Sequence, residues 1–110
     1  MLLLEKVRME IYLPDLPVNS YRDLLETFET EFTYTFGGCT ILHGLDGRYL
    51  SQAGTSIPDR ISLIYSDLPL TLTRNLETIT RYVGKLKQIA FEALEEEAIL
   101  IVVTQVFHAV

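Results

Sequence analysis

The chain has few side chains that could take part in chemistry, and their spacing limits what they could do. Its one cysteine, Cys39, and one of its two histidines, His43, stand four residues apart in a stretch that predicts a strand. At roughly 3.3 Å per residue they lie about 13 Å apart, so they cannot be a nucleophile and a base in contact. We therefore interpret Cys39 as a buried structural cysteine.

The two histidines, His43 and His108, are too few for a metal site of three imidazoles within one chain. They could converge if the last strand met the hairpin across a subunit boundary, with Tyr12 and Tyr65 beside a shared cavity. We keep Tyr12, His43, Tyr65 and His108 as a candidate ligand pocket. The alternatives are a filled interface, and histidines that only form hydrogen bonds at strand ends.

No catalytic or cofactor motif occurs in the sequence. It contains no GxGxxG, GxxxxGK[ST], GxSxG, HExxH or CxxC, and turns explain its glycines. Four acids, Glu92, Glu95, Glu96 and Glu97, crowd the end of a predicted helix. A solvated helix end explains them more simply than a divalent-cation or effector sensor, which would need oxygens from elsewhere. We predict no catalytic residue, no metal and no cofactor, and we favour a protein that is not an enzyme.

Composition limits the partners. The chain has 110 residues, 48% of them hydrophobic, which predicts one α+β domain over residues 1–110. Fifteen acids against nine scattered bases give a net charge of −6, which disfavours nucleic acid and anionic membranes. The longest apolar run, residues 98–103, is too short to span a bilayer, and no secretory leader is recognised. We expect a cytoplasmic protein.

Periodicity predicts the first two elements. Residues 4–13 alternate between apolar and polar, which is typical of a strand with one buried face, and Pro14 ends it. Ser20 and Asp23 have the form of a capping box. An amphipathic helix follows, because apolar residues recur at helical spacing: Tyr21, Leu24, Leu25, Phe28 and Phe32.

A hairpin is predicted next, from residues 39–44 and 48–51 around an Asp46-Gly47 turn of type I′, with Gly44 opposite Tyr49. A strand over residues 60–66 and a long helix over about residues 71–97 follow. Residues 99–108 form a final strand that is apolar on both faces.

This order predicts a ferredoxin-like β-α-β-β-α-β sandwich, with two helices on one face of an antiparallel sheet and an extra short hairpin strand. Right-handed crossovers place the first and last strands side by side. The last strand would then leave apolar side chains in water unless another subunit covered them. We therefore predict a homo-oligomer, most simply a homodimer.

The middle of the chain also resembles small, uncharacterised bacterial proteins with a ferredoxin-like fold. The resemblance rests on three pieces of sequence, Phe36-Gly37-Gly38-Cys39-Thr40, Gly47-Arg48-Tyr49, and Gly54 with Asp59. It implies the fold and no activity. Trimeric signalling and metal-tolerance proteins are similar in element order alone, because their nucleotide-binding and metal-binding signatures are absent here.

Two functional hypotheses remain open. The first is a non-enzymatic oligomeric domain with a structural, regulatory or protein-binding role. The alternative is a cofactor-free small-molecule enzyme or binder of the dimeric α+β barrel kind, with its pocket between subunits. An enclosed pocket that holds at least two of the four candidate side chains would favour the alternative.

Overall fold

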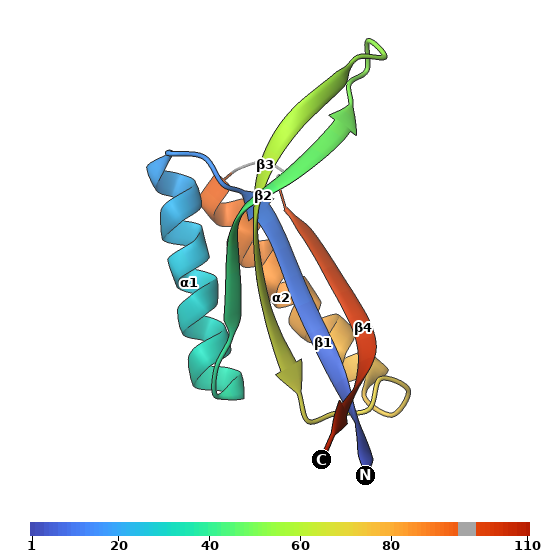
Figure 1. The fold of residues 1–110 in the computed structure, drawn as a ribbon. Coiled ribbons are helices and arrows are strands. Elements are labelled where there is room, and N and C mark those ends of the chain that lie inside the picture. The colour runs from blue at the N-terminus through green and yellow to red at the C-terminus, as the bar shows by residue number, and fades with distance from the viewer. Residues whose placement is uncertain (95–98) are drawn as a thin grey trace.

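The computed structural model describes residues 1–94 and 99–110. Its elements follow the predicted β-α-β-β-α-β order (Figure 1): β1 (Leu3–Pro14), α1 (Asn19–Phe36), β2 (Thr40–Leu50), β3 (Ser56–Leu68), α2 (Leu76–Leu94) and β4 (Leu100–Ala109). The ferredoxin-like α+β fold is therefore confirmed.

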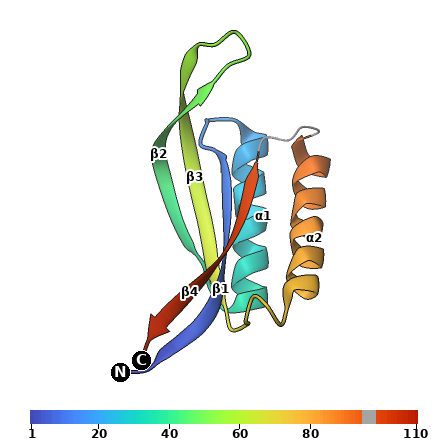
Figure 2. The same cartoon turned by 90° about the vertical axis from the view of Figure 1, so that its right-hand side faces the viewer.

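The four strands form one antiparallel sheet in the order β2-β3-β1-β4. β1 lies in the interior of the sheet and pairs with β4, so the first and last strands are neighbours, as predicted. Both helices cover the same face of the sheet (Figure 2). The molecule thus has two layers, and no described element covers the second face of the sheet, which we call the open face.

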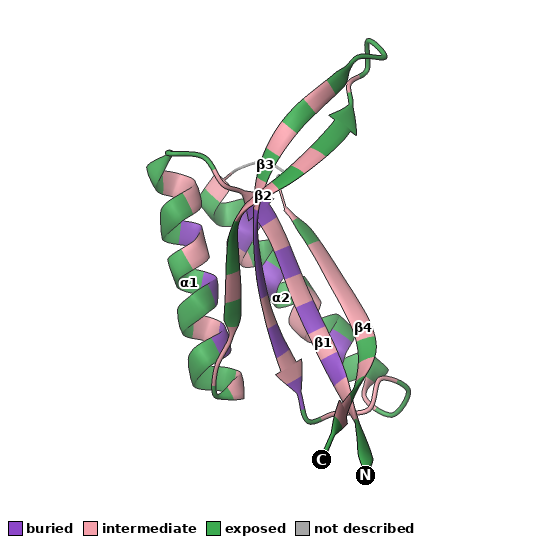
Figure 3. Cartoon of the chain, viewed as in Figure 1, coloured by how far each residue is buried: buried purple, intermediate pink, exposed green. Residues whose placement is uncertain are grey.

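The core lies between the sheet and the helices, and its residues are those that the periodicity singled out. Alternate residues of β1 point to the helices and are at most 2% exposed, as the banding of β1 in Figure 3 shows. The helices add buried stripes at helical spacing. Together these residues are Val7, Met9, Ile11 and Leu13 of β1, Leu24, Phe28 and Phe32 of α1, and Ile79, Leu86 and Ala90 of α2.

The predicted capping box at the start of the first helix is wrong. α1 begins at Asn19, Val18 occupies the cap position, and no side chain caps the helix. The amides of Tyr21 and Arg22 instead donate to the Val18 carbonyl, at 3.1 and 3.2 Å. At the other end Gly37 adopts a φ of 90° and donates to the Thr33 carbonyl, which closes the helix with a residue suited to that conformation.

The second helix is shorter at its start than predicted. Thr71 and Asn75 form a closed turn, because the Thr71 amide donates to Asn75 Oδ1 and the Asn75 amide donates to the Thr71 carbonyl, both at 3.1 Å. α2 therefore begins at Leu76. The predicted end of this helix at residues 95–97 lies outside the described residues.

The predicted Asp46-Gly47 turn and the extra short strand are wrong. β2 runs unbroken through both residues, which pair with Arg60 and Asp59 of β3. The turn lies later, where the Ser51 amide donates to the Thr55 carbonyl at 2.9 Å and Gly54 has a φ of 80°. Tyr49 consequently pairs with Ile57 and does not face Gly44.

Gly44 is a bulge residue. Its φ is 64°, and the pairing of β2 with β3 shifts there by one residue, between Leu42 and Leu45. The Gly44 amide donates to Asp15 Oδ2 at 2.7 Å, and the Asp15 amide donates to the Arg60 carbonyl at 2.8 Å. The connection between β1 and α1 thereby holds the bulge in place.

Beyond the bulge, β2 and β3 leave the body of the molecule as a two-stranded ribbon (Figures 1 and 2). We call residues 45–60 the β-arm. The arm extends past the ends of both helices, so neither helix covers it.

Candidate functional site

The polar side chains that could do chemistry gather on the open face. In β1 the residues between the core positions point away from the helices, and among them are Arg8, Glu10 and Tyr12. Cross-strand partners share a face, so Asp67 and Tyr65 of β3, which pair with Arg8 and Glu10, lie on the open face too.

Arg8, Asp67 and His108 form a connected ionic cluster. Arg8 Nε donates to Asp67 Oδ1 at 2.8 Å and its second terminal nitrogen donates to Asp67 Oδ2 at 3.0 Å, a bidentate pair. His108 Nε2 lies 2.6 Å from the same Oδ2 atom. The Arg8 guanidinium also lies over the Tyr65 ring, 4.3 Å from its centroid. The cluster thus ties β3, β1 and β4 together.

The electrostatics favour an ionised Asp67. The hydrogen bonds from Arg8 lower the pKa of the Asp67 carboxyl, burial opposes them, and His108 lowers it further. The same hydrogen bonds raise the pKa of Arg8. The Asp67 side chain is 14% exposed and that of His108 is 42% exposed. The carboxylate is therefore the shielded centre of the cluster, and the imidazole is its outer member.

A shallow depression of about 510 Å³ lies beside the cluster, between it and residues 36–40, which join α1 to β2. A Cβ added at Gly37 or Gly38 would meet no atom within 4 Å, so these glycines leave open space. Cys39 is half-buried there, its Sγ 3.8 Å from Thr33 Oγ1. The depression could admit a small polar group, but Arg8 and Asp67 already neutralise each other.

The four side chains of the predicted pocket do not all meet. Tyr65 and His108 lie in the same cluster, joined through Arg8 and Asp67. Tyr12 shares the open face but donates to Glu10 Oε2 at 2.9 Å, and this hydrogen bond raises the pKa of Tyr12.

His43 stands apart from the other three. Its Nδ1 lies 3.3 Å from Oγ of Ser62, a buried residue of the helix-covered face. It follows Ile41 on the same face of β2, as the spacing predicted. One chain therefore brings two of the four together.

Sequence reasoning missed Asp67 as the centre of the site. Arg8 stood on the predicted polar face of the first strand, but its partner is 59 residues away in sequence. A clue was available, because an acid within the apolar run that ends β3 needs a cation if it is shielded from water.

No group of three His, Cys, Asp or Glu side chains among the described residues is placed to hold a metal ion. Of the predicted acidic helix end, Glu92 accepts a hydrogen bond from Gln88 at 3.0 Å, and Glu95, Glu96 and Glu97 lie outside the described residues. Within the described part of the chain, no helix is long and apolar enough to cross a membrane.

Comparisons with known proteins support the fold. No family model and no curated protein matches the sequence. Among solved structures, CPII from Thiomonas intermedia K12, a nitrogen regulatory PII-like protein bound to ADP, AMP and bicarbonate, is similar at a TM-score of 0.54 and 18% identity, over 98% of this chain and 97% of that one.

Two cation-tolerance proteins are similar as well. CutA1 from Oryza sativa has a TM-score of 0.57 at 11% identity, over 94% of this chain and 81% of that one. The divalent cation tolerance protein Cut A1 from Thermus thermophilus has a TM-score of 0.56 at 18% identity, over 92% and 82%. At these identities the likeness establishes the shared ferredoxin-like fold.

Proposed function

We propose that the chain is a non-enzymatic module that assembles with copies of itself through the open face and serves a regulatory or protein-binding role. The observation that carries the proposal is the exposure of the last strand, β4. It pairs with β1 alone among the described strands, and none of its residues is buried. Its Leu100, which pairs with Tyr12 on the open face, is 58% exposed, so part of the apolar surface of β4 is not covered by its own chain.

The open face offers further apolar area. By the sheet register, Val102 and Val106 of β4 and Leu42 of β2 lie on it. None of the three is buried, and Leu42 is 42% exposed. Full burial of one such side chain contributes roughly 1.5–3 kcal/mol, so covering several of them would stabilise an assembly.

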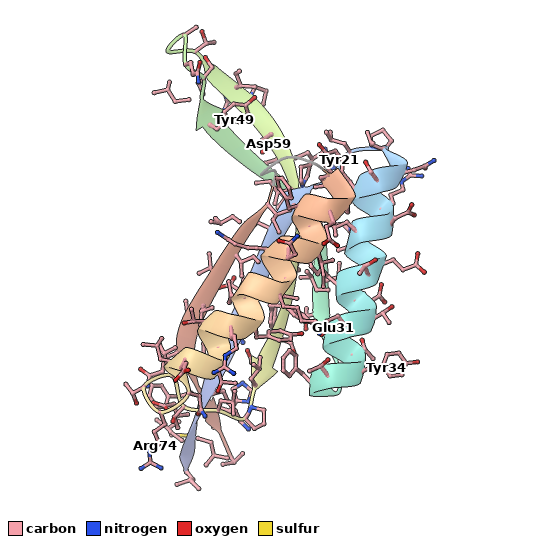
Figure 4. The ribbon with its side chains drawn as sticks, turned by 180° about the vertical axis from the view of Figure 1, so that it is seen from behind. Tyr21, Glu31, Tyr34, Tyr49, Asp59 and Arg74 are labelled. Atoms are coloured by element: carbon pink, nitrogen blue, oxygen red, sulfur yellow. The ribbon has the colours of Figure 1, made fainter. Side chains whose placement is uncertain are left out.

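The β-arm supports the same proposal. An isolated two-stranded ribbon is marginally stable in water. The bulge turns Leu45 and Tyr49 to the open face, where they pair with Ile61 and Ile57. Figure 4 shows Tyr49 and Asp59 on the arm, beyond the ends of both helices. A second copy packed on this apolar side would stabilise the arm as well as the sheet.

The regulatory role is proposed partly from the comparisons, since the PII-like neighbour is named as a nitrogen regulatory protein. A homodimer is the simplest closed assembly. The net charge of −6 disfavours nucleic acid and anionic membrane surfaces as partners, and we propose the cytoplasm as the setting.

Sedimentation velocity at micromolar concentration tests the proposal. The expected species is a multiple of the 12.6 kDa chain. Val102→Asp on the open face should reduce it to the monomer while the circular dichroism spectrum stays that of the folded chain. Thr80→Asp on the exposed surface of α2 is the matched control and should leave the assembly unchanged. A wild-type chain that is strictly monomeric would contradict the proposal.

A small-molecule pocket between subunits is the second candidate function, and the depression that holds Tyr65 and His108 favours it. Titration calorimetry with ADP and AMP, the nucleotides named for the PII-like neighbour, is a direct test of one ligand class. We expect no heat, because the chain has no phosphate-binding glycine motif and its bases are scattered. Saturable binding of either nucleotide would instead favour this second candidate.

A further inference from the structure

We infer that the outer edge of β4 pairs with β4 of a second copy of the chain, antiparallel and about a two-fold axis at Thr104, so that two sheets join into one. This contact goes beyond the proposed packing on the open face. It rests on the proposed function only in requiring that copies of the chain associate. The inference begins from the two edges of the sheet, which are β2 and β4.

The two edge strands differ in how well they are protected against pairing with another chain. Natural proteins protect a sheet edge with bulges, charged side chains or proline. β2 has such protection, because the bulge at Gly44 interrupts it and the charged Asp46 and Arg48 follow. The ten residues of β4 include no acid, lysine, arginine, proline or glycine. Its pairing with β1 continues without a register shift, so its outer edge is long, regular and unprotected.

The hydrogen bonds of β4 within the chain determine which of its backbone groups point outward. Leu2 and Val110 exchange both backbone hydrogen bonds, at 3.0 and 2.8 Å. In an antiparallel pair, such bonded residue pairs alternate with pairs that are not bonded. The register therefore makes the even-numbered residues of β4 bond to β1, and the odd-numbered ones direct their N–H and C=O groups outward. The outward residues are Ile101, Val103, Gln105 and Phe107.

The alternation of side chains restricts the register of two β4 strands. A two-fold axis perpendicular to the sheet makes each face of one sheet continuous with the same face of the other. Even-numbered residues must then lie opposite even-numbered ones, and the outward odd-numbered residues lie opposite each other and can exchange hydrogen bonds. Two registers meet this condition and pair all but one of the ten residues of β4, one centred on Thr104 and the other on Gln105.

The register centred on Thr104 is the better match, because it pairs similar side chains. On the open face, Thr104 lies opposite its own copy and Val102 lies opposite the partner's Val106. On the other face, Ile101 lies opposite the partner's Phe107, which is 56% exposed in the single chain. Threonine pairs and pairs of an aromatic with a β-branched residue stabilise a sheet. The other register places valine opposite histidine. Because the match is between two identical strands, it favours a second copy over a peptide of another protein.

Two substitutions at Gln105 test the pairing. Gln105→Pro removes an outward N–H group and leaves the bonds to β1 intact, so a strand edge tolerates it. In the paired strands it removes two hydrogen bonds, one from each copy. Gln105→Ala is the matched control, because it loses the same side-chain contact with Glu5 and retains the N–H group.

Sedimentation velocity over a concentration series gives the dissociation constants of both variants. The constant of Gln105→Pro should exceed that of Gln105→Ala by about tenfold or more, while the circular dichroism spectra agree. A proline variant that associates as tightly as the alanine variant would overturn the inference and leave the proposed packing on the open face standing. A strictly monomeric wild-type chain would overturn both.

Disulfide crosslinking tests the register without a proline. Cys39→Ser removes the one native thiol. In that background Thr104→Cys places two thiols opposite each other at the axis, where Cα atoms about 4.5 Å apart are within disulfide range. Mild oxidation should yield a species of twice the 12.6 kDa chain mass.

Val102→Cys in the same background is the control for crosslinking. It lies on the same face as Thr104, but in the inferred register the two copies of residue 102 are about 13 Å apart along the strands. It should therefore form the disulfide at least about tenfold more slowly than Thr104→Cys. Equal rates at the two positions, or no crosslink at residue 104, would overturn the inference.

Discussion

The two faces of the sheet are built from the same strands and use opposite chemistry. On β1, Val7, Met9 and Ile11 point to the helices and are fully buried. The residues between them include Arg8 and Glu10, which point to the open face and hold ionic or hydrogen-bonded partners. Neighbouring residues of β1 therefore differ in role: one packs in the apolar core, and the next forms ionic or hydrogen-bonded contacts on the open face.

Because one face is apolar and the other is ionic, we expect the two faces to have separate roles. The helix-covered face supplies the apolar burial that holds a single chain together. The open face contributes less burial within the chain and carries the ionic cluster of Arg8, Asp67 and His108. Substitutions on the first face should change folding, and those on the second should change assembly.

The largest expected effect is on the covered face. Phe28 is fully buried between α1 and the sheet, so Phe28→Ala should reduce the free energy of unfolding by about 3–5 kcal/mol. Urea denaturation measures it. Tyr34 of the same helix is 86% exposed and points away from the body in Figure 4. Tyr34→Ala should change the free energy of unfolding by less than about 0.5 kcal/mol. Equal losses of stability in the two variants would contradict separate roles for the covered and exposed surfaces.

Adjacent residues of β4 give a sharper contrast. Val103 packs against the core and Val102 faces the other way. Val103→Asp should lower the free energy of unfolding by about 2–4 kcal/mol, because it places a polar group against apolar side chains. Val102→Asp should have its main effect on the sedimentation coefficient. If both variants unfold alike in urea, the open face is part of the fold of the single chain.

The bulge at Gly44 decides which residues of β2 belong to which face. Before it Leu42 lies on the open face, and after it Leu45 does. Gly44→Ala should lower the free energy of unfolding by about 1–2 kcal/mol, because a φ of 64° is unfavourable for a residue with a Cβ. Gly38→Ala is the control, since its added Cβ meets no atom within 4 Å and its φ is not positive. Equal stability of the two variants in urea would argue against a constrained bulge.

The smallest effect is on the ionic cluster. Asp67→Asn should lower the free energy of unfolding by about 1 kcal/mol at pH 7, a modest figure because Arg8 is one-third exposed. The folded state lowers the pKa of Asp67, so its contribution is complete above about pH 5, well above the ordinary carboxyl pKa, and disappears as the pH falls through the lower folded value.

The difference between wild type and Asp67→Asn in urea should accordingly shrink between about pH 5 and pH 2. Glu77→Gln is the control, because its pair with Arg81 is exposed and should contribute almost nothing. A difference for Asp67→Asn that is constant with pH would show that the carboxylate charge is not what stabilises the cluster.

The sequence was sufficient to predict those helices and strands whose pattern of apolar residues lies within a single segment. The alternation of Val7 to Leu13 and the stripe through Phe28 and Phe32 predicted β1 and α1, and their order predicted the sheet. The hairpin prediction failed because Asp46-Gly47 is a good turn only when judged by itself. Asp15 holds the positive φ at Gly44 instead, through a contact between residues 29 apart in sequence.

The site was harder to predict for the same reason. The structure places Tyr65 and His108, two of the four predicted pocket residues, in one cluster, but Asp67, which connects His108 to Arg8, was not singled out. Its role depends on the register between β1 and β3, which places Arg8 directly opposite Asp67. A pattern in one strand does not reveal the register with another. His43 lies apart from these side chains within one chain, and its approach to His108 across a subunit boundary stays a prediction.

The bulge held by Asp15 is also the point at which the β-arm leaves the body of the molecule. From Leu45 to Leu50 the arm extends for about 17 Å at roughly 3.3 Å per residue, so a rotation of about 10° at Gly44 would carry Leu50 through about 3 Å. Asp15 begins the connection to α1, and its carboxylate bonds directly to the Gly44 amide. A small displacement of that connection would therefore be amplified at the tip of the arm, far from where it began.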